Sequence, residues 1–229
     1  MTVDAVLFDL DDTLCRYRRG GARLLAEGFE RVGVEPLFTL EAYHARYREH
    51  LGEIDDIDAF REYCFAELAE ERGADPELGR EVARIYADER DQTAVDPLDG
   101  VPDVVEELAD DHAVGLITNG PTEMQRTKLS AVDLDGIFEV EVFAGYDAPA
   151  KPDPEPFVLA LDELRVDPQQ AVHVGNSLTT DVAGANAAGV GAVWLREDGA
   201  TAPAAIEDEP GPEPDYVIEE LEALTEPPW

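Results

Sequence analysis

The sequence predicts an α/β fold in which a doubly wound parallel sheet carries an inserted α-helical domain. Two observations predict it: short apolar runs alternate with amphipathic helical patterns over most of the chain, and one long stretch contains helical patterns alone. Alternation of this kind is typical of parallel strands joined by helices. We therefore expect a core formed by residues 1–15 and 93–229 and a helical domain formed by residues 16–92.

The expected strands are short, mostly apolar runs, and several end at a polar residue. The first run, 5–8, is followed by Asp9 and is typical of a buried strand. Further strands are expected at 113–117, 171–174, 192–195 and 216–218, with helices at 101–110, 122–131, 154–164, 178–188 and 219–224. Residues 198–215 contain four prolines and are expected to form a surface loop.

The inserted domain is expected to consist of four amphipathic helices, at 21–33, 39–52, 57–73 and 76–91. The clearest boundary is Gly73-Ala74-Asp75-Pro76. Gly is a common helix stop, Asp is a favoured N-cap, and Pro is favoured at the first helical position. The pattern therefore predicts that one helix ends and the next begins within these four residues.

The charge of the chain excludes some partners. Lys and Arg number 17 against 53 Asp and Glu, a formal net charge of −36, while 44% of residues are hydrophobic. Such a field repels nucleic acids and anionic membrane surfaces, so we expect no nucleic-acid or membrane partner. Carboxylates scattered over a globular pattern, with almost no lysine, indicate a halophilic protein whose self-repulsion is screened by molar salt.

The chain shows no membrane or secretion signal. No apolar run approaches the roughly 18 residues of a membrane span, and Met1 leads directly into a short apolar run flanked by acids. Cys15 and Cys64 form no metal-type spacing and are expected to be small buried or half-buried thiols. We expect a soluble, cytoplasmic protein.

Polar residues at the ends of two expected strands form the first two motifs. In Asp9-Leu10-Asp11-Asp12-Thr13, alternation places Asp9 and Asp11 on one side of an extended chain, where the carboxylates repel each other unless a cation or proton intervenes. Thr118-Asn119-Gly120 offers a hydroxyl and free N–H groups that suit an anionic oxygen, although it is also an ordinary strand exit.

Two further motifs lie toward the C-terminus. Lys151, between Ala150 and Pro152, is one of only two lysines among 17 basic residues, and its ammonium could neutralise a phosphate. The other lysine, Lys128, lies among polar neighbours on a helical pattern and is expected to be solvated. In the run 174–181, Asn176 and Asp181 supply the oxygen ligands that a hard cation prefers.

In this order, the four motifs resemble those of the haloacid dehalogenase superfamily of hydrolases. The resemblance covers essentially the whole chain, and it implies a Rossmann-like core with a helical cap inserted after the first motif. It also implies a Mg²⁺-dependent phosphatase that hydrolyses small phosphomonoesters. One residue departs from the pattern, because most metal-dependent members carry Asp where this chain has Asn176.

The resemblance also implies roles for single residues. Asp9 would be the nucleophile that forms an aspartyl-phosphate, and Asp11 would protonate the leaving alcohol and then activate water. Thr118, the Asn119 amide and Lys151 would hold the phosphate oxygens. Mg²⁺ would be held by the Asp9 carboxylate, the Asp11 main-chain carbonyl and the loop that contains Asn176 and Asp181. The cap would close over the site and select the leaving group.

Two alternatives remain open on the sequence. A metal-free 2-haloacid dehalogenase is favoured by Asn176 and disfavoured by Asp11, because displacing halide needs no general acid. A non-catalytic phospho-acceptor module also uses acidic strand ends, a Thr and a Lys, but such modules are far shorter and lack a helical insert of this size. The sequence leaves the identity of the phosphomonoester and the oligomeric state open.

Overall fold

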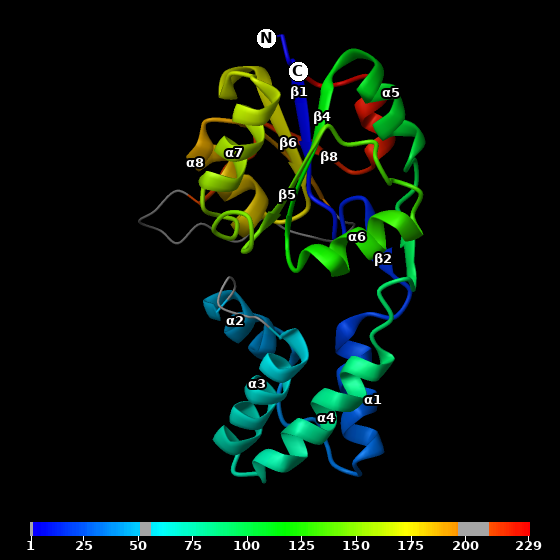
Figure 1. Ribbon diagram of the computed structural model, residues 1–229, viewed down its shortest axis with the longest axis vertical. Coiled ribbons are helices and arrows are strands. Elements are labelled where there is room, and N and C mark those ends of the chain that lie inside the picture. The colour runs from blue at the N-terminus through cyan, green and yellow to red at the C-terminus, as the bar shows by residue number, and fades with distance from the viewer. Residues whose placement is uncertain (1, 51–55, 197–210) are drawn as a thin grey trace. The chain divides into compact units, whose positions relative to one another are not determined.

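The computed structural model describes residues 2–50, 56–196 and 211–229. These divide into two compact units, one formed by Met1–Arg16 with Val95–Trp229 and the other by Tyr17–Ala94. We call them the core unit and the helical unit. Figure 1 traces both along the chain, and each is described here by itself.

The core unit is built on a six-stranded sheet in which every strand pairs in parallel with its neighbours. Its order is β5-β4-β1-β6-β7-β8, so the first strand of the chain lies in the middle. The strands are β1 (Ala5–Phe8), β4 (Ala113–Asn119), β5 (Val140–Ala144), β6 (Ala171–Gly175), β7 (Gly191–Leu195) and β8 (Tyr216–Ile218). All four residues of β1 are buried, as expected of a central strand covered on both faces.

Helices cover both faces of this sheet (Figure 1). On one face lie α7 (Glu155–Leu164) and α8 (Ala183–Ala188), whose apolar side chains join those of the strands in one buried cluster. On the other lie α5 (Asp103–Asp111) and the 3₁₀-helix η3 (Leu221–Thr225). The doubly wound parallel sheet predicted from the sequence is therefore confirmed.

A small two-stranded sheet, β2 (Cys15–Tyr17) with β3 (Val95–Pro97), lies where the chain passes between the two units. Cys15 and Cys64 are free and buried, as expected. Burial raises the pKa of the Cys15 thiol to about 12, with the carboxylate of Asp11 adding to the shift, so this thiol is inert at neutral pH.

The helical unit consists of α1 (Gly21–Arg31), α2 (Leu40–His50), α3 (Ile57–Glu71) and α4 (Pro76–Glu89). Phe65 lies at the centre of its aromatic core, with ring centroids 5.0 Å from Phe38 and Tyr43 and 5.8 Å from Tyr86. Gly79 allows α4 to approach α3, because a Cβ there would lie 2.2 Å from the Phe65 carbonyl oxygen.

The helix boundaries follow local sequence signals closely. Asp75 caps α4 by accepting a hydrogen bond from the main-chain N–H of Glu77, and Pro76 occupies the first helical position, as the sequence predicts. Asp56 caps α3 in the same way. The expected helix 178–188 is instead a π-helical turn, η2 (Leu178–Val182), that continues into α8.

The sequence analysis missed β5. Its residues are Val-Glu-Val-Phe-Ala, and Glu141 interrupts the apolar run by which the other strands were recognised. Because β5 lies at the edge of the sheet, a charged side chain is tolerated there, and Glu141 pairs with Arg126 of α6 (Thr122–Ala131) at 3.3 Å. Most of the expected loop 198–215 lies outside the described residues.

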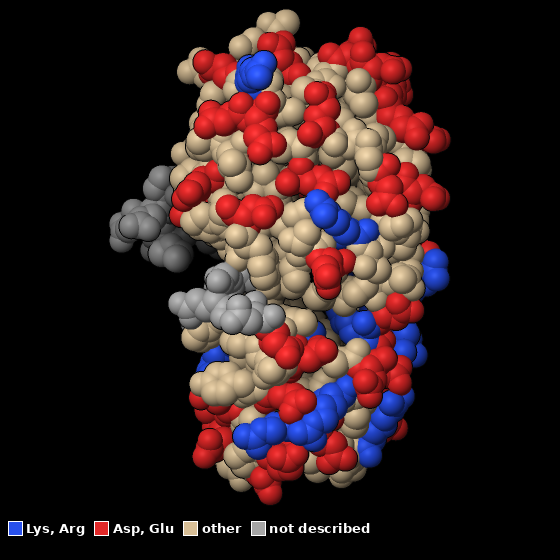
Figure 2. Space-filling view, in the orientation of Figure 1, with Lys and Arg blue, Asp and Glu red and all other residues tan. Residues whose placement is uncertain are grey.

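Acidic side chains cover much of the visible face of the core unit in Figure 2, whereas arginines alternate with acids on the helical unit. Arginines of the helical unit also join different helices, as Arg46 of α2 does with Glu67 of α3 at 2.7 Å and Arg84 of α4 does with Glu62 of α3 at 2.9 Å. Within the described residues, no helix has the length and apolar character required to cross a membrane.

Candidate active site

The candidate site lies at the carboxyl ends of three adjacent strands, β1, β4 and β6. Asp9 follows β1, Thr118 and Asn119 end β4, and Asn176 follows β6. Because β1 is the strand from which the chain order runs in opposite directions, this edge is the switch point of the sheet. In open α/β sheets, ligands bind at that position.

A tight turn after β1 places the two aspartates. The Asp9 N–H donates to the Val174 carbonyl at 3.0 Å, which continues the β1–β6 ladder by one residue. The Leu10 carbonyl then accepts N–H bonds from Thr13, Leu14 and Cys15 at 2.9–3.2 Å, while Asp12 takes a left-handed conformation with φ 59°. The buried Thr13 hydroxyl donates to Asp9 Oδ2 at 3.2 Å and orients the carboxylate.

Lys151 is the centre of the site. Its Nζ donates to Asp9 Oδ1 at 2.8 Å, to Asp181 Oδ1 at 2.7 Å and to the Ile117 carbonyl at 2.6 Å, which accounts for all three ammonium protons. The Lys151 side chain is 1% exposed and that of Asp181 is 2% exposed. The structure thus joins residues from three of the four sequence motifs through one buried ammonium.

Burial and charge shift the pKa values of these groups in different directions. Burial raises the pKa of Asp9 to about 7, against the attraction of Lys151 and with the repulsion of Asp181. Burial opposes ionisation of Asp181 and Lys151 too, yet their mutual attraction lowers the pKa of Asp181 and raises that of Lys151. Asp181 and Lys151 therefore form an ion pair. Asp9 is the carboxyl group whose ionised form is disfavoured in this buried cluster.

Asn119 fixes the loop that carries Lys151. Its side-chain Nδ2 donates to the Lys151 carbonyl at 3.1 Å, and its Oδ1 accepts the Lys151 N–H at 2.9 Å. The side-chain amide therefore holds the loop of Lys151, and the main-chain N–H of Asn119 is a further donor for the phosphate-binding role expected from the resemblance.

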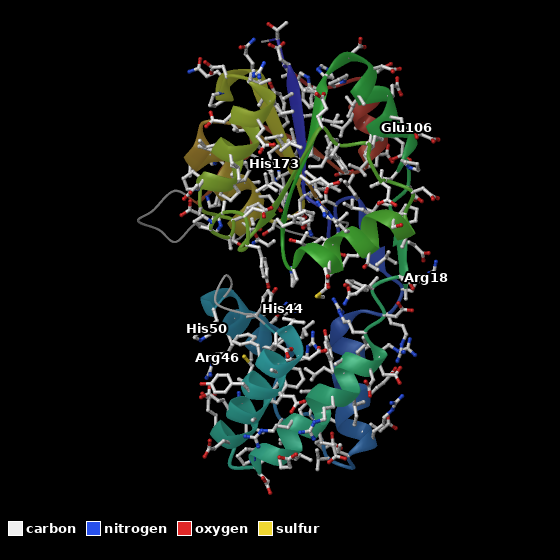
Figure 3. All side chains as sticks on the ribbon, viewed as in Figure 1. Arg18, His44, Arg46, His50, Glu106 and His173 are labelled. Atoms are coloured by element: carbon white, nitrogen blue, oxygen red, sulfur yellow. The ribbon has the colours of Figure 1, made fainter. Side chains whose placement is uncertain are left out.

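Residues of β6 and of the turn after it contact the Asp181 carboxylate. Its Oδ2 accepts the Ser177 N–H at 2.9 Å, and its Oδ1 also lies 3.4 Å from Nε2 of His173, which Figure 3 labels. A Cβ at Gly175 would lie 2.4 Å from Asp181 Cγ, so only glycine leaves room for this carboxylate beneath the strand end. The Asn176 side chain is half-buried and makes no hydrogen bond to any described residue.

The expectation that Lys128 is solvated is wrong. Its side chain is 4% exposed, and its Nζ contacts both oxygens of Asp11, at 2.7 and 2.8 Å. Polar sequence neighbours suggested a surface position, but the face of α6 that carries Lys128 packs against the turn after β1. The rarity of lysine, which drew attention to Lys151, was the available signal and applied equally to Lys128.

Gln125 is a second residue that the sequence analysis missed. It is 1% exposed, and its Nε2 donates to Thr118 Oγ1 at 2.6 Å, to Asp11 Oδ2 at 3.0 Å and to the Asn119 carbonyl at 3.3 Å. A lone glutamine on a helix gives no sequence signal, because its partners are defined only by the packing of α6.

The donor set fits a hard divalent cation. Asp9, Asp11 and Asp181 carry three carboxylates against the two ammonium groups of Lys151 and Lys128, so one negative charge is in excess, in accord with the raised pKa of Asp9. Among the described residues, no cluster of three or more His, Cys, Asp or Glu is arranged to hold a metal ion. Mg²⁺ binds through one or two carboxylates and keeps several waters, so it requires no such cluster.

The sheet, the inserted helices and the strand-end residues together define a class of enzyme. The sequence pattern of the haloacid dehalogenase-like hydrolases matches residues 3–189, which is most of the chain. The chain belongs to this family and is a hydrolase.

Curated proteins similar to this chain include phosphatases. The chain is 33% identical to a phosphoserine phosphatase of Thermus thermophilus over 218 residues, which cover 83% of this chain and 87% of that protein. It is 31% identical to a glyceraldehyde 3-phosphate phosphatase of Methanopyrus kandleri over 205 residues, covering 85% of this chain and 84% of the relative.

Solved structures share the fold over nearly the full length. A 2-haloacid dehalogenase of Pseudomonas syringae superimposes with a TM-score of 0.62 at 28% identity, covering 98% of this chain and 97% of that one. A Bacillus subtilis hydrolase of the family, bound to magnesium, gives a TM-score of 0.68 at 22% identity, with 99% and 98% covered. The second likeness concerns the fold alone.

Proposed function

We propose that the protein is a Mg²⁺-dependent phosphomonoester hydrolase that acts through an aspartyl-phosphate. The observation that carries the proposal is the contact of one buried ammonium, Lys151 Nζ, with both Asp9 and Asp181 beside the Thr118 hydroxyl. A phosphate-handling site in a chain of charge −36 needs local positive charge, which Lys151, Lys128 and a bound Mg²⁺ would supply together. The phosphatase relatives support the same reaction.

Asp9 is the proposed nucleophile. One carboxylate oxygen attacks phosphorus, the bond from phosphorus to the leaving alcohol breaks, and the phosphoryl group is carried on the aspartate. Thr13 and Lys151 each hold one oxygen of this carboxylate, so the side chain is fixed before substrate arrives. Burial raises the pKa of Asp9 to about 7 in the metal-free protein, so Lys151 and a bound Mg²⁺ would favour the ionised form that attacks phosphorus.

Asp11 is the proposed acid and base. Two residues after the nucleophile and with 37% of its side chain exposed, it has access to the leaving oxygen and to water. It would donate a proton to the departing alcohol and then take one from the water that hydrolyses the acyl-phosphate. The similarity to a 2-haloacid dehalogenase supports the alternative function of dehalogenation. That reaction needs no general acid, so it would give Asp11 no role.

The phosphate oxygens would be held by Thr118, by the main-chain N–H of Asn119 and by Lys151, which would exchange one of its three present contacts for the anion. Thr118 Oγ1 accepts a hydrogen bond from Gln125, so its own proton is free to point toward a bound anion. Mg²⁺ would be held by the Asp9 carboxylate, the Asp11 carbonyl and Asn176. The Asp181 carboxylate would add negative charge to the site. When bound, Mg²⁺ would neutralise charge on the phosphoryl group.

We further propose that residues 17–94 are the cap domain of the family pattern and that the enzyme works in a cytoplasm of high salt. The helical unit would then select the leaving group. Small phosphomonoesters, such as the phosphoserine and triose phosphate named for the relatives, are the substrate class to test first.

The test is a panel of phosphomonoesters assayed with Mg²⁺ in molar KCl, in parallel with halide release from a 2-haloacid. Phosphate release should require Mg²⁺, stop on addition of EDTA, and fall below a few per cent in Asp9→Asn, because an amide is no nucleophile. Halide release that persists in EDTA, without phosphate release, would instead establish the dehalogenase. Trapping of a stable acyl-phosphate without turnover would establish the phospho-acceptor.

A further inference from the structure

Both lysines of the chain contact aspartates of the turn that follows β1. Arginine provides the other 15 of the 17 basic residues, yet Asp9 and Asp11, which follow β1, are each contacted by a lysine. Lys151 contacts Asp9, and Lys128 contacts both oxygens of Asp11. Each lysine side chain is at most 4% exposed. An ammonium is a compact charge with three donors on a flexible stem, and at both positions it contacts a carboxylate that follows β1.

Lys128 and Gln125 occupy one face of α6. Residues three apart on a helix are neighbours on its surface, and both side chains point to the same carboxylate. Gln125 Nε2 lies 3.0 Å from Asp11 Oδ2, which Lys128 Nζ approaches at 2.8 Å. Because α6 starts three residues after β4 ends, the helix that carries these side chains is tied directly to the strand that carries Thr118.

Gln125 also links Asp11 to the proposed phosphate-binding hydroxyl. Its amide has two protons and three acceptors within reach: Asp11 Oδ2, Thr118 Oγ1 at 2.6 Å and the Asn119 carbonyl at 3.3 Å. The shortest of these contacts makes the Thr118 hydroxyl an acceptor, which directs its own proton elsewhere. One side chain therefore orients two groups with different tasks.

We propose that Lys128 and Gln125 are positioning residues that hold the Asp11 carboxylate, and with it the Thr118 hydroxyl, in the orientation needed for proton transfer at the leaving oxygen. The inference rests on the proposed phosphatase function, in which Asp11 is the acid and base. Neither side chain is assigned a contact with substrate, and they act through Asp11 and Thr118. A half-exposed aspartate on a turn has several rotamers, and three hydrogen bonds from two side chains of α6 favour one of them.

The test is a double-mutant cycle between Lys128→Met and Asp11→Asn, assayed with para-nitrophenyl phosphate and phenyl phosphate in Mg²⁺ and molar KCl. Methionine keeps the length and apolar stem of lysine and removes the charge. Arg126→Met is the matched control, because it removes a cation from the same helix whose side chain is 63% exposed and pairs with Glu141 instead. Far-UV circular dichroism and thermal unfolding show whether each variant folds.

Lys128→Met should lower kcat on phenyl phosphate by about 10- to 100-fold with little change in KM, since misplacing a catalytic group costs on this scale. The loss should be smaller on para-nitrophenyl phosphate, whose leaving group needs no proton. In the Asp11→Asn background the same substitution should change kcat by no more than about twofold, because the residue through which it acts is already gone. Gln125→Leu should show the same dependence on the leaving group but should keep part of its loss in the Asp11→Asn background, because Gln125 also contacts Thr118. Lys128→Arg should recover part of the activity.

Equal losses from Lys128→Met with and without Asp11, or equal losses on the two substrates, would overturn the inference and make Lys128 a structural residue. Wild-type activity in Lys128→Met would overturn it as well. These results are distinct from failure of the proposed function, which would appear as full activity in Asp11→Asn itself. Should Lys128→Met not fold, Gln125→Leu carries the cycle with the charge of Lys128 retained, and an equal loss with and without Asp11 would again overturn the inference.

Discussion

Replacing Asp9 with asparagine should stabilise the metal-free protein at alkaline pH. The Asp9 carboxylate is buried beside Asp181 and has its pKa raised from 3.8 to about 7, so its ionised form destabilises the fold. A carboxyl whose folded pKa is raised contributes stability that is fully present below the unfolded pKa and is lost as pH rises through the folded pKa. Asparagine imitates the neutral form and removes this loss.

The magnitude follows from the shift. About three pKa units at about 1.4 kcal/mol each set a ceiling of about 4 kcal/mol on the gain above pH 7. The gain should grow by up to about 1.4 kcal/mol per pH unit between pH 4 and pH 7 and then level off. Asparagine also changes the hydrogen bonds to Thr13 and Lys151. That change shifts the difference in unfolding free energy by the same amount at every pH, so its pH dependence is unaffected.

The assay is urea unfolding of wild type and Asp9→Asn with EDTA in molar KCl, at half-unit steps from pH 4 to pH 8. Asp135→Asn serves as the control, because it removes an exposed carboxylate and corrects for the change in net charge. Millimolar Mg²⁺ at pH 8 should stabilise wild type more than Asp9→Asn and so reduce the difference. A difference in unfolding free energy that does not vary with pH would refute the assignment of the buried excess charge to Asp9.

Three further predictions concern charge at and around the site. Lys151→Met should destabilise the protein by about 3–5 kcal/mol in urea unfolding and abolish turnover, since it leaves Asp9 and Asp181 as buried carboxylates without their cation; a loss below about 1 kcal/mol would contradict the buried ion pair. Asn176→Asp should lower the Mg²⁺ concentration for half-maximal activity, and Asp181→Asn should raise it, because hard-cation affinity follows the charge of the surrounding ligands; an unchanged requirement in Asn176→Asp would place residue 176 away from the metal. The midpoint of chemical unfolding should rise between 0.1 and 3 M KCl as the net charge of −36 is screened, with the Debye length falling to about 3 Å near 1 M; a midpoint that is insensitive to KCl would contradict the halophilic interpretation.

Local sequence signals determined much of the fold. The buried strand β1, the capped start of α4 at Asp75 and Pro76, and the helix over Thr122–Ala131 all depend on interactions within a few residues, and each lies where the sequence places it. The strand-end positions of Asp9 and Thr118 follow for the same reason. The edge strand β5 was not predicted, because its position at the edge of the sheet permits the charged Glu141 within the strand and so interrupts the apolar run.

The candidate site could be predicted only where its chemistry is carried by motifs. Asp9, Lys151 and Asp181 lie together in the structure as the family resemblance implies, and the roles given to them stay predictions. The same resemblance gave no role to Gln125, and polar neighbours gave the wrong environment for Lys128.

What the sequence by itself determined is therefore which segments become strands and helices and which chemical groups stand at the strand ends. What only the tertiary structure decided is which groups meet: Lys128 and Asp11 are 117 residues apart, and they are joined because α6 packs on the turn after β1. The physical reason is the separation along the sequence of the residues that interact. Helix caps and apolar runs are local interactions readable from neighbouring residues, whereas an ion pair across the fold exists only after the sheet has brought β1 and β4 side by side.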